Sequence, residues 1–586
     1  MTRTRLTGLP APVARHETIA AALAAAARHP SGVTFVGRRE EETSLPWAAV
    51  HRRALRVAGA LGARGVKPGD RVAIVLRTEP AFLDAFFGTL LAGAVPVPLY
   101  PPVRLGRMEE YLAATARMMR VSGARIAVAS PAVRRILGEA VRAARPALAL
   151  GVVDAGELAG GPEFLVPGGP GDLALVQFSS GSTVDPKPVA LTQANIVAQV
   201  EALTQLVEPT SSDVLVSWLP LYHDMGLIGC LLGAMSYPGP LVLIPPEHFL
   251  ARPALWLRAI ARHRGTISAA PHFAYGYAAD RVGDEDLRGL SLASWRIALD
   301  GAEPVTASTL RRFAARFARH GLDPGALMPV YGLSEAALAV TFSPRGRSPR
   351  VEALDPQRLA AGEIAPGLRE VLSVGTPIPG VELEVRAEAG QPLPERRLGR
   401  IHVRGPSVMQ GYLGDDAGTA RVLAGGWLDT GDLGFHAGGE LFVHGRAKDV
   451  VIVHGANHAP DEFESCLVHL PGVRPGCAVA LGFVPPGGDG EELLLLVERA
   501  PGSSARDEGL AEAVRRAVLE RTGVRAHTIS MLAPGTLPRT SSGKMRRAEA
   551  LRRYHSGALR PPARVSALSM TRHLLRSGLA YARSRR

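Results

Sequence analysis

Lysine is almost absent from this sequence, although basic residues are plentiful. The chain has 586 residues, 67 of them arginine or lysine, and a formal net charge of +13. Only four of the 67 are lysines, namely Lys67, Lys187, Lys448 and Lys544. A GC-rich genome that favours arginine codons would explain the imbalance. Under such a bias a solvated lysine is freely replaced by arginine, so we expect the lysines that survive inside functional motifs to be needed for their compact, mobile ammonium group.

Cysteine is also scarce, and long apolar runs are missing. Cys230, Cys466 and Cys477 show no CxxC spacing and no metal-ligand pattern, so no disulfide framework is expected. The N-terminal residues lack the apolar core of a signal peptide, and no uncharged apolar run reaches the length of a membrane span. Together these absences predict a protein of the reducing cytoplasm.

Several familiar signatures are absent too. There is no GxxxxGK[ST] loop, which excludes a Walker A nucleotide site. There is no GxSxG turn and no cysteine in an activating context, which excludes the common serine and cysteine hydrolases. The positive charge does not favour nucleic-acid binding, because much of the excess lies in one terminal segment, where residues 556–586 hold seven arginines and no acid.

The sequence does contain a long alternation of strand-like and helix-like segments. Its composition is globular, with 46% hydrophobic and 21% charged residues, and its length predicts two to four domains. The alternation predicts helices layered on mainly parallel strands. Predicted helices include 79–92, 108–121 and 252–263. Predicted strands include 71–76, 125–130, 173–178, 213–220, 241–246, 265–271 and 295–303.

The pattern changes after about Gly375 to short strands separated by turns, at 381–387, 399–405 and 439–446, and becomes α/β again from 450 to 554. We therefore predict an α/β protein of two domains and a tail. Residues 1–446 would form a large N-terminal domain of layered α/β subdomains with a small β-barrel-like part. Residues 447–556 would form a small C-terminal α+β domain, followed by a basic tail at 557–586.

One loop has the composition of a phosphate site. The stretch SSGSTVDPKPVALT (179–192) follows the predicted strand 173–178 and precedes a helical pattern. Small hydroxyl residues, free backbone N–H groups and a helix N-terminus are the parts that wrap a polyphosphate. The residues alone leave an ordinary surface loop equally open.

Six further motifs follow this loop. They are PLYHDMGLIG (220–229), LDGAEPV (299–305), YGLSEAAL (331–338), WLDTGDLG (427–434), GRAKDVVIVHGANHAPDEFE (445–464) and PRTSSGKMRR (538–547). Together, and in this order, they resemble the ATP-dependent adenylate-forming enzymes, which include acyl-CoA synthetases, adenylation domains and luciferases. The resemblance covers roughly residues 15–555. It implies a large domain that binds ATP and substrate, and a small domain that rotates between two half-reactions.

Within that superfamily the motifs look most like the fatty acyl-AMP ligases. Those enzymes use ATP and Mg²⁺ to activate fatty acids and load them on the phosphopantetheine arm of an acyl carrier protein, with coenzyme A a poor acceptor. The segment 349–380 also resembles them, at a family insertion thought to restrain the small domain and oppose use of coenzyme A.

The resemblance assigns roles to three of the four lysines. Lys544 matches the catalytic lysine, whose ammonium would bridge the substrate carboxylate and the α-phosphate and offset their repulsion. Lys187 matches a positive charge beside the leaving pyrophosphate, where Ser182 and Thr183 would handle phosphate. Lys448 matches the hinge of the small domain. From the residues alone, each lysine could instead belong to a surface loop or linker.

Other motif residues match nucleotide contacts. Asp432 matches the acid that accepts from the ribose hydroxyls, and Arg446 a second contact. Tyr331 would stack on the adenine beside Gly332. Glu335 matches the Mg²⁺-linked carboxylate, since Mg²⁺ often binds one carboxylate plus substrate phosphates. In the family a backbone shelf lies beside the adenine, and its residues correspond here to Gly301, Ala302 and Glu303. The alternatives are a turn-capping role for the aspartate and a core role for the tyrosine.

Two positions depart from the family pattern. Pro188 stands where glycine is usual, which stiffens the phosphate loop because proline fixes φ and has no N–H. His272 stands where asparagine is usual, in a segment that lines the acyl pocket, so we expect an unusual substrate. His223 matches a position near the substrate carboxylate and is our third catalytic candidate, with a structural role also open. We expect the neighbouring Asp224 to face elsewhere, so that the two form no dyad.

Two other functions remain open. An acyl-CoA synthetase would share the first half-reaction, and an inactive adenylate-type scaffold would bind a carrier domain without catalysis. The scaffold is disfavoured because Lys544, Asp432, Arg446 and Glu335 are all present. In the tail, residues 567–584 place leucines among arginines. This pattern predicts a basic amphipathic helix that binds either an anionic membrane or an acidic carrier protein. A frayed terminus is the open alternative.

Overall fold

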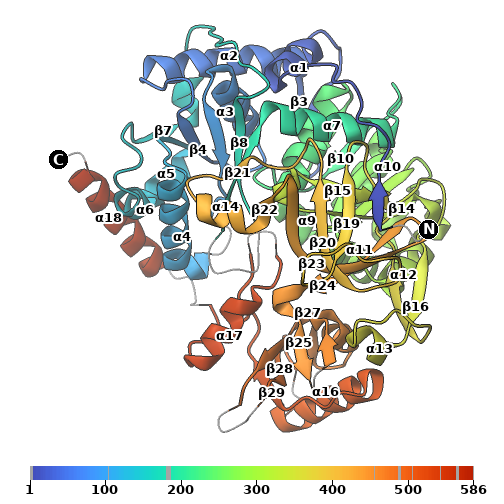
Figure 1. The fold of residues 1–586 in the computed structure, drawn as a ribbon. Coiled ribbons are helices and arrows are strands. Elements are labelled where there is room, and N and C mark those ends of the chain that lie inside the picture. The colour runs from blue at the N-terminus through green and yellow to red at the C-terminus, as the bar shows by residue number, and fades with distance from the viewer. Residues whose placement is uncertain are drawn as a thin grey trace.

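The computed structural model describes residues 4–102, 105–179, 186–453, 456–485, 490–503, 506–540, 543–562 and 567–584. Figure 1 shows a large lobe, coloured blue to light orange, and a smaller orange-to-red lobe below it. Both lobes combine helices and sheets, as predicted. Ser182 and Thr183 lie outside the described residues, so their predicted phosphate contacts stay predictions.

The largest sheet has nine strands, and its carboxyl edge positions much of the site. Its six central strands are parallel to one another, and the strands next to these six on both sides are antiparallel to them. Buried parallel strands read as nearly continuous apolar runs, which is why the sequence revealed four of them, at 213–220, 241–246, 265–271 and 295–303. In spatial order the strands are β18 (Thr376–Pro377), β15 (Ala339–Phe342), β14 (Leu327–Gly332), β13 (Ile297–Gly301), β12 (Ile267–Pro271), β10 (Leu215–Ser217), β11 (Leu241–Leu243), β2 (Gly32–Val36) and β3 (Glu42–Pro46).

Helices cover both faces of this sheet. An aromatic cluster that includes Trp256, Trp295 and Phe313 forms a core against one set of them, with rings 5–6.5 Å apart in mostly edge-to-face contacts. The helices of this part are α1 (Ile19–Ala26), α7 (Gln193–Val207), the π-helix η3 (Met225–Leu232), α8 (Gly233–Ser236), α9 (Pro246–Ala251), α10 (Ala254–His263), α11 (His272–Arg281) and α12 (Ala307–Phe317).

A second, entirely parallel sheet lies in the same lobe. Its strands in spatial order are β5 (Val95–Pro98), β4 (Arg71–Val75), β6 (Ile126–Ala129) and β7 (Val152–Asp154). Its helices are α2 (Trp47–Ala63), α3 (Pro80–Leu91), α4 (Met108–Val121), α5 (Pro131–Ile136) and α6 (Gly138–Ala143). The predicted helices at 79–92 and 108–121 are thereby confirmed as α3 and α4.

The predicted strand–loop–helix at 173–192 is wrong. The loop joins two antiparallel strands, β8 (Leu173–Phe178) and β9 (Pro188–Thr192), and β9 also pairs with β21 (Gly411–Tyr412). Helix α7 begins only after β9, with a capping box in which Thr192 and Asn195 bond reciprocally. The short run 188–192 is a buried strand that we had included in the loop. Pro188 opens this strand, a position that needs no ladder N–H.

The turn-rich region forms a six-stranded antiparallel sheet with an insertion beside it. The strands are β1 (Arg5–Thr7), β19 (Glu382–Arg386), β20 (Gly399–Arg404), β22 (Leu423–Ala424), β23 (Trp427–Ala437) and β24 (Glu440–Arg446), and α14 (Asp416–Val422) precedes β22. The insertion is a hairpin of β16 (Val351–Leu354) and β17 (Arg369–Leu372) around α13 (Pro356–Ala360).

The small lobe follows a single 3₁₀ turn, η8 (Ala447–Asp449), and has its own apolar core. It contains the hairpin β25 (Val451–Val453) and β26 (Ala456–His458), the sheet β27 (Val473–Phe483), β28 (Glu492–Arg499) and β29 (Thr528–Leu532), and the helices α15 (Pro460–Glu464), α16 (Asp507–Thr522) and α17 (Arg547–His555).

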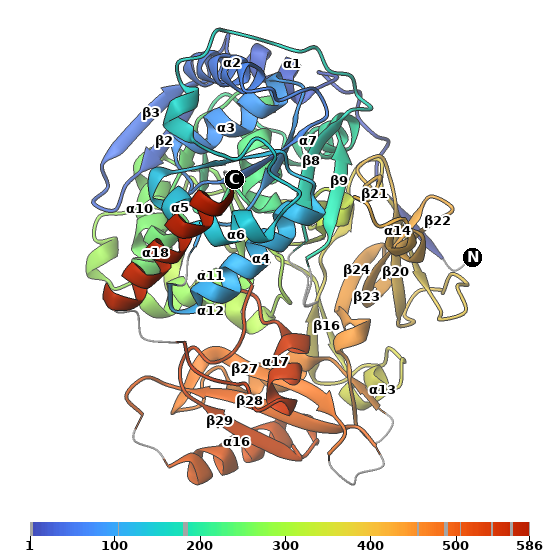
Figure 2. The same ribbon diagram turned by 90° about the vertical axis from the view of Figure 1, so that its left-hand side faces the viewer.

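The tail forms a helix that returns to the large lobe. Figure 2 shows α18 (Ala567–Ser584) lying against α5 and α6. The hydroxyl of Ser577 accepts a hydrogen bond from the Gly138 N–H at 2.8 Å, and Ser577 is buried. The helical alternative for the tail therefore holds. No helix within the described ranges is both long enough and apolar enough to cross a membrane.

Candidate active site

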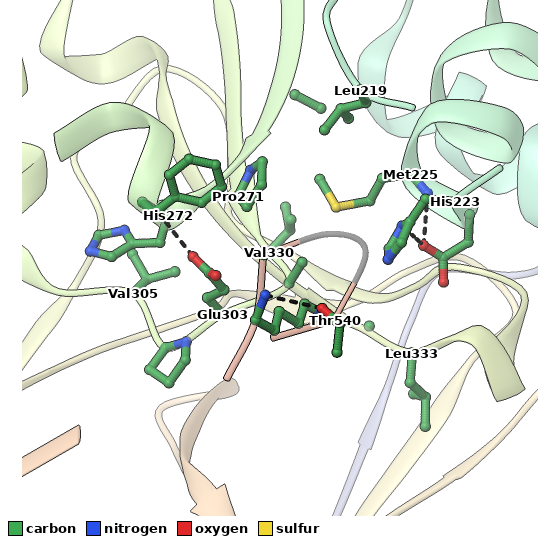
Figure 3. A pocket seen from close by; sticks show the side chains of 18 of the residues that line it. Leu219, His223, Met225, Pro271, His272, Glu303, Val305, Val330, Leu333 and Thr540 are labelled. Carbon is green, nitrogen blue, oxygen red and sulfur yellow. Dashed lines mark hydrogen bonds and ion pairs between the residues drawn. The ribbon is translucent and has the colours of Figure 1, made fainter. Parts of the chain in front are cut away.

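A large cavity lies between the two lobes and extends into the large lobe. Its volume is about 1550 Å³, and Figure 3 shows part of its lining, with His223, Glu303 and Thr540 around the centre. It brings together most of the residues singled out from the sequence: Lys187, His223, Ala302, Glu303, Tyr331, Gly332, Glu335, Asp432, Arg446, Lys448 and Lys544.

Three of the predicted nucleotide residues form one polar cluster. Asp432 and Arg446 are cross-strand partners on β23 and β24, with Arg446 Nε 3.5 Å from Asp432 Oδ1. The hydroxyl of Tyr331, at the end of β14, donates to Asp432 Oδ2 at 2.7 Å. The carboxylate is therefore held from two sides, with its position fixed before any ligand binds.

Burial dominates the electrostatics of this cluster. It raises the pKa of Asp432, and the Arg446 guanidinium opposes the shift. Burial, together with the Asp432 carboxylate, also raises the pKa of Tyr331 well above its usual range. The phenol therefore remains a hydrogen-bond donor at neutral pH, so the carboxylate oxygens keep an acceptor role.

The predicted shelf at 301–303 follows β13 and has an unusual backbone. A Cβ on Gly301 would lie 2.8 Å from the Val330 carbonyl, so only glycine fits between β13 and β14. Ala302 has a φ of +66°, a strained conformation for a residue with a side chain. Gly301 lies behind the cavity wall rather than on it, whereas Ala302 and Glu303 line the cavity.

Glu303 reaches across to the neighbouring helix. Its Oε2 accepts a hydrogen bond from the Phe273 N–H at 3.0 Å, in the first turn of α11. This carboxylate therefore connects the shelf with the segment 268–277, which we predicted to line the acyl pocket.

A second polar cluster surrounds Tyr412, a residue that our reading of the sequence missed. The Tyr412 hydroxyl donates to Glu335 Oε1 at 3.0 Å, and the Lys187 ammonium lies 4.2 Å from the centre of its ring. One tyrosine thus places the predicted metal-linked carboxylate and the predicted pyrophosphate lysine near each other. Burial raises the pKa of Glu335, against its hydrogen bonds. In the sequence, Tyr412 is marked only by the preceding Gly411 and by its position between the motifs at 331–338 and 427–434.

His223 and Asp224 do form a pair, so the expectation that they face apart is wrong. His223 Nδ1 lies 2.5 Å from Asp224 Oδ1, and the Ser334 hydroxyl donates to Asp224 Oδ2 at 2.5 Å. Asp224 is the N-cap of η3 and has helical dihedral angles, so neighbouring side chains are not set on opposite faces as in a strand. Burial alone would raise the pKa of Asp224, but His223 and Ser334 outweigh it and lower that pKa.

Lys544 enters the cavity from the small lobe. Its backbone N–H donates to the Thr540 hydroxyl at 3.0 Å, and its carbonyl accepts from the Thr540 N–H at 2.8 Å, which closes the loop around the lysine. Burial lowers the pKa of Lys544, while the carboxylates of Asp224 and Glu303 act in the opposite direction. Lys544 thus faces acids from the two segments that lead to the acyl side of the cavity.

Polar contacts hold the small lobe in this orientation. Lys448 lies exposed in η8, the connection between the lobes. Arg553 on α17 pairs with Glu110 on α4 at 2.8 Å, and Arg107 donates to the Thr536 carbonyl at 3.0 Å. Interfaces of this polar kind are compatible with relative motion, in keeping with the predicted hinge.

The hairpin insertion joins both lobes. On β17, Arg369 pairs with Glu462 of the small lobe at 3.0 Å and lies 3.6 Å from Asp461. The next residue, Glu370, pairs with Arg311 on α12 of the large lobe at 2.7 Å. Because successive side chains of a strand point to opposite faces, one short strand contacts the two lobes at once.

His272 is a satisfied buried histidine. Its Nδ1 lies 2.7 Å from Asp300 Oδ2 and its Nε2 lies 2.9 Å from the Thr306 hydroxyl. Burial would lower the pKa of His272, but Asp300 outweighs it and raises that pKa. Both ring nitrogens have protein partners, which favours a structural role over the recognition of an unusual substrate.

Comparison with known proteins identifies the family. Residues 23–413 match the family described as AMP-binding enzyme. The long-chain-fatty-acid–AMP ligase FadD26 of Mycobacterium marinum is 34% identical over 88% of this chain and 92% of its own. A Caulobacter vibrioides protein described as a candidate acyl-CoA synthetase is 36% identical over 92% of this chain and 96% of its own. The chain belongs to the AMP-binding enzymes.

The fold agrees with this family. A structure solved in a study of fatty acyl-adenylate ligases from E. coli and L. pneumophila superimposes with a TM-score of 0.87 at 34% identity, covering 94% of this chain and 99% of that one. The predicted superfamily and fold class are confirmed. In this AMP-binding enzyme, the described residues contain no group of three His, Cys, Asp or Glu side chains placed to hold a metal. A Mg²⁺ carried mainly by substrate phosphates would still fit, because it needs one carboxylate such as Glu335.

Proposed function

We propose that this AMP-binding enzyme is a fatty acyl-AMP ligase that loads an acyl carrier protein. The observation that supports this most is one continuous cavity that has a polar wall at Asp432, Tyr331 and Glu335 and extends between η3 and the large sheet, where its lining is apolar. Two relatives with fatty acyl substrates in their names are similar to this chain over nearly their whole length. A fatty acid and ATP would meet where Lys544 enters.

In the first half-reaction a carboxylate oxygen attacks the α-phosphorus of ATP, the bond to the bridging oxygen breaks, and pyrophosphate leaves. Asp432 would hold the ribose hydroxyls, and Tyr331 would support Asp432 and face the base. Lys544 would sit between the carboxylate and the α-phosphate, where its charge is worth most in the transition state. His223, held by Asp224, would lie beside the carboxylate. These roles rest on position and on family resemblance.

The polyphosphate would extend toward Tyr412. Lys187 would lie near the departing pyrophosphate, and Glu335 would supply a carboxylate for Mg²⁺. When bound, Mg²⁺ neutralises phosphate charge. The charge of Lys187 would add to that effect, and the hydrogen bond from Tyr412 would keep the Glu335 carboxylate oriented.

In the second half-reaction a thiol sulfur attacks the acyl carbon and AMP leaves. The bridge formed by Arg369 and Glu370 supports a carrier protein over coenzyme A as the acceptor, because it ties the small lobe to the large one and limits rotation. Acyl-CoA synthesis is the second candidate, and the description of the Caulobacter relative favours it.

Product analysis tests the proposal. The protein is incubated with ATP, Mg²⁺ and a panel of fatty acids, with coenzyme A or a holo carrier protein, and products are identified by mass spectrometry. We expect acyl-AMP in every reaction with a suitable acid, and thioester mainly on the carrier. Efficient acyl-CoA formation would establish the second candidate instead, and the absence of any adenylate would reject both.

A further inference from the structure

The apolar arm of the cavity follows one face of a single helical run. The π-helix η3 and helix α8 together span Met225–Ser236 and are followed by Tyr237. Met225, Gly229, Gly233 and Tyr237 all line the cavity and are accessible, while most residues between them are buried. We call these four residues, spaced every four positions, the channel face. Figure 3 shows Met225 at its start, projecting into the cavity between His223 and Val330.

The large sheet forms the opposite wall and gives the arm its direction. Leu299 on β13 pairs with Ala269 on β12, and Ile267, at the start of β12, pairs with Leu215, at the start of β10. All four line the cavity. The arm therefore crosses the sheet from the carboxyl ends of the strands, where Lys544 and His223 lie, toward their amino ends.

Tyr237 lies at the far end of the arm, close to the surface. Its side chain is 36% exposed, and the neighbouring lining residues include Thr204 and Val207 at the end of α7. The guanidinium of Arg15 lies over the Tyr237 ring at 5.4 Å from its centre, and Arg15 is itself paired with Glu201 on α7 at 3.0 Å. The N-terminal segment thus holds the tyrosine in place.

Glycine creates the space in the middle of the arm. A Cβ added at Gly233 would meet no atom closer than 3.9 Å, whereas one at Gly229 would lie 2.9 Å from Leu338. A Cβ at position 233, which lines the cavity, would therefore fit without displacing protein atoms. Position 233 is where the free length of the channel is most easily changed.

The length of the run sets an upper limit on the acyl chain. The twelve residues of η3 and α8 span at most about 18 Å at 1.5 Å per residue. A zigzag chain with C–C bonds of about 1.5 Å advances about 1.25 Å per carbon, so the channel holds at most about 14 carbons.

We propose that the channel face selects the length of the fatty acid, with Gly233 leaving room for its middle and Tyr237, held by Arg15, closing the far end. This inference rests on the proposed fatty acyl-AMP ligase activity and adds the length of its substrate: a fatty acid near the length of myristate. Neither residue touches the reacting atoms, so both act on specificity alone.

The test compares chain-length profiles of wild type, Gly233→Leu and Tyr237→Ala by ATP–pyrophosphate exchange with octanoate, laurate, myristate, palmitate and stearate. We expect the kcat/KM of Gly233→Leu for myristate, relative to octanoate, to fall at least about 100-fold, since several methylenes lose their site. We expect Tyr237→Ala to gain about tenfold on stearate relative to wild type. Gly509→Leu is the matched control, because Gly509 is an exposed glycine of α16 with open space around it.

The outcomes separate the two proposals. If wild type activates no fatty acid, the proposed function fails. If wild type is active but the three profiles are parallel, or if a folded Gly233→Leu loses octanoate as well as myristate, the channel inference is overturned. Circular dichroism shows whether the leucine variant folds. If it does not fold, the same comparison is made with Gly233→Ala, which adds one methyl group, and with Tyr237→Ala.

Discussion

The two ends of the cavity are built in opposite ways. At the nucleotide end, hydrogen bonds and an ion pair fix the positions of the charged groups. Asp432 is held by Tyr331 and Arg446, and Glu335 is held by Tyr412. At the acyl end, the important feature is the absence of side chains along the channel face at Gly229 and Gly233. A polar ligand is recognised by groups that meet it, and an alkyl chain by the shape of the space left for it.

This difference predicts that mutations at the two ends change different kinetic parameters. Changes at the polar end should alter ATP binding and leave the chain-length profile unchanged. Changes on the channel face should do the reverse. Lys544, which enters where the two ends meet, should affect turnover of every acid alike.

The largest effect is expected for Lys544→Ala. Removing the ammonium from between two anionic reactants should lower the rate of acyl-AMP formation by about 100- to 1000-fold, as for loss of other charge-stabilising donors. ATP–pyrophosphate exchange measures this rate. Lys544→Arg should restore little, because a planar guanidinium does not replace a compact ammonium in a crowded site.

Lys67→Ala is the matched control, because Lys67 is exposed and lies outside the cavity. We expect it to keep wild-type exchange. If Lys544→Ala exchanged as fast as Lys67→Ala, the assignment of Lys544 to the adenylation step would be wrong.

A smaller effect, limited to the polar end, is expected for Asp432→Ala. Losing hydrogen bonds to a charged acceptor should raise the KM for ATP by about 10- to 100-fold, with the same preference among fatty acids as wild type. Asp429→Asn on the same strand is the control, because Asp429 pairs with Arg400 and does not line the cavity. A change of chain-length preference in Asp432→Ala would contradict the separation of the two ends.

Arg369→Ala should change the acceptor rather than either end of the cavity. Without the pair to Glu462 the small lobe is freer to rotate, so we expect acyl-CoA formation to increase. If the lost pair stabilised the present orientation by about 1.4 kcal/mol, the increase is about tenfold. Thioester products on coenzyme A and on the carrier are compared by mass spectrometry, with Arg358→Ala as the control, since that arginine pairs only with Glu363 on the surface of the insertion. An unchanged acyl-CoA yield would show that the insertion does not determine which acceptor is used.

The smallest effect on catalysis is expected for deletion of residues 557–586. Helix α18 contacts α5 and α6 and not the cavity, so adenylation should stay within about threefold of wild type, while the Tm falls by about 2–4 °C through lost packing. Vesicle flotation and carrier loading test the tail separately, because Leu575 and Leu579 remain exposed on it. Unchanged flotation and loading would dismiss a membrane or carrier role.

The same contrast explains what the sequence could predict. The four central strands β10 to β13 of the large sheet and the polar motif residues were recognisable, because buried parallel strands and charged groups leave distinct patterns. The hairpin of β8 and β9 was missed, since the five residues of β9 were included in the Ser/Thr/Gly-rich loop that precedes α7. The pairing of His223 with Asp224 depends on the helical backbone at the start of η3, and Tyr412 acquires its partners only through the contact of β21 with β9.

The channel face could not be predicted for a further reason. The channel around Gly229 and Gly233 depends on residues distant in sequence, such as Leu338 beside Gly229 and the cavity-lining residues of β10, β12 and β13. Spacing alone does not distinguish glycines that face a cavity from glycines that allow close helix packing.

A crystal structure with a hydrolysis-resistant myristoyl-adenylate analogue tests the account most directly. We expect the ribose hydroxyls on Asp432, the adenine beside Tyr331, the acyl–phosphate junction at Lys544, and the alkyl chain along Met225, Gly229 and Gly233 with its end at Tyr237. An alkyl chain in another part of the cavity, or a ribose away from Asp432, would contradict the division of this cavity into a polar end and a channel.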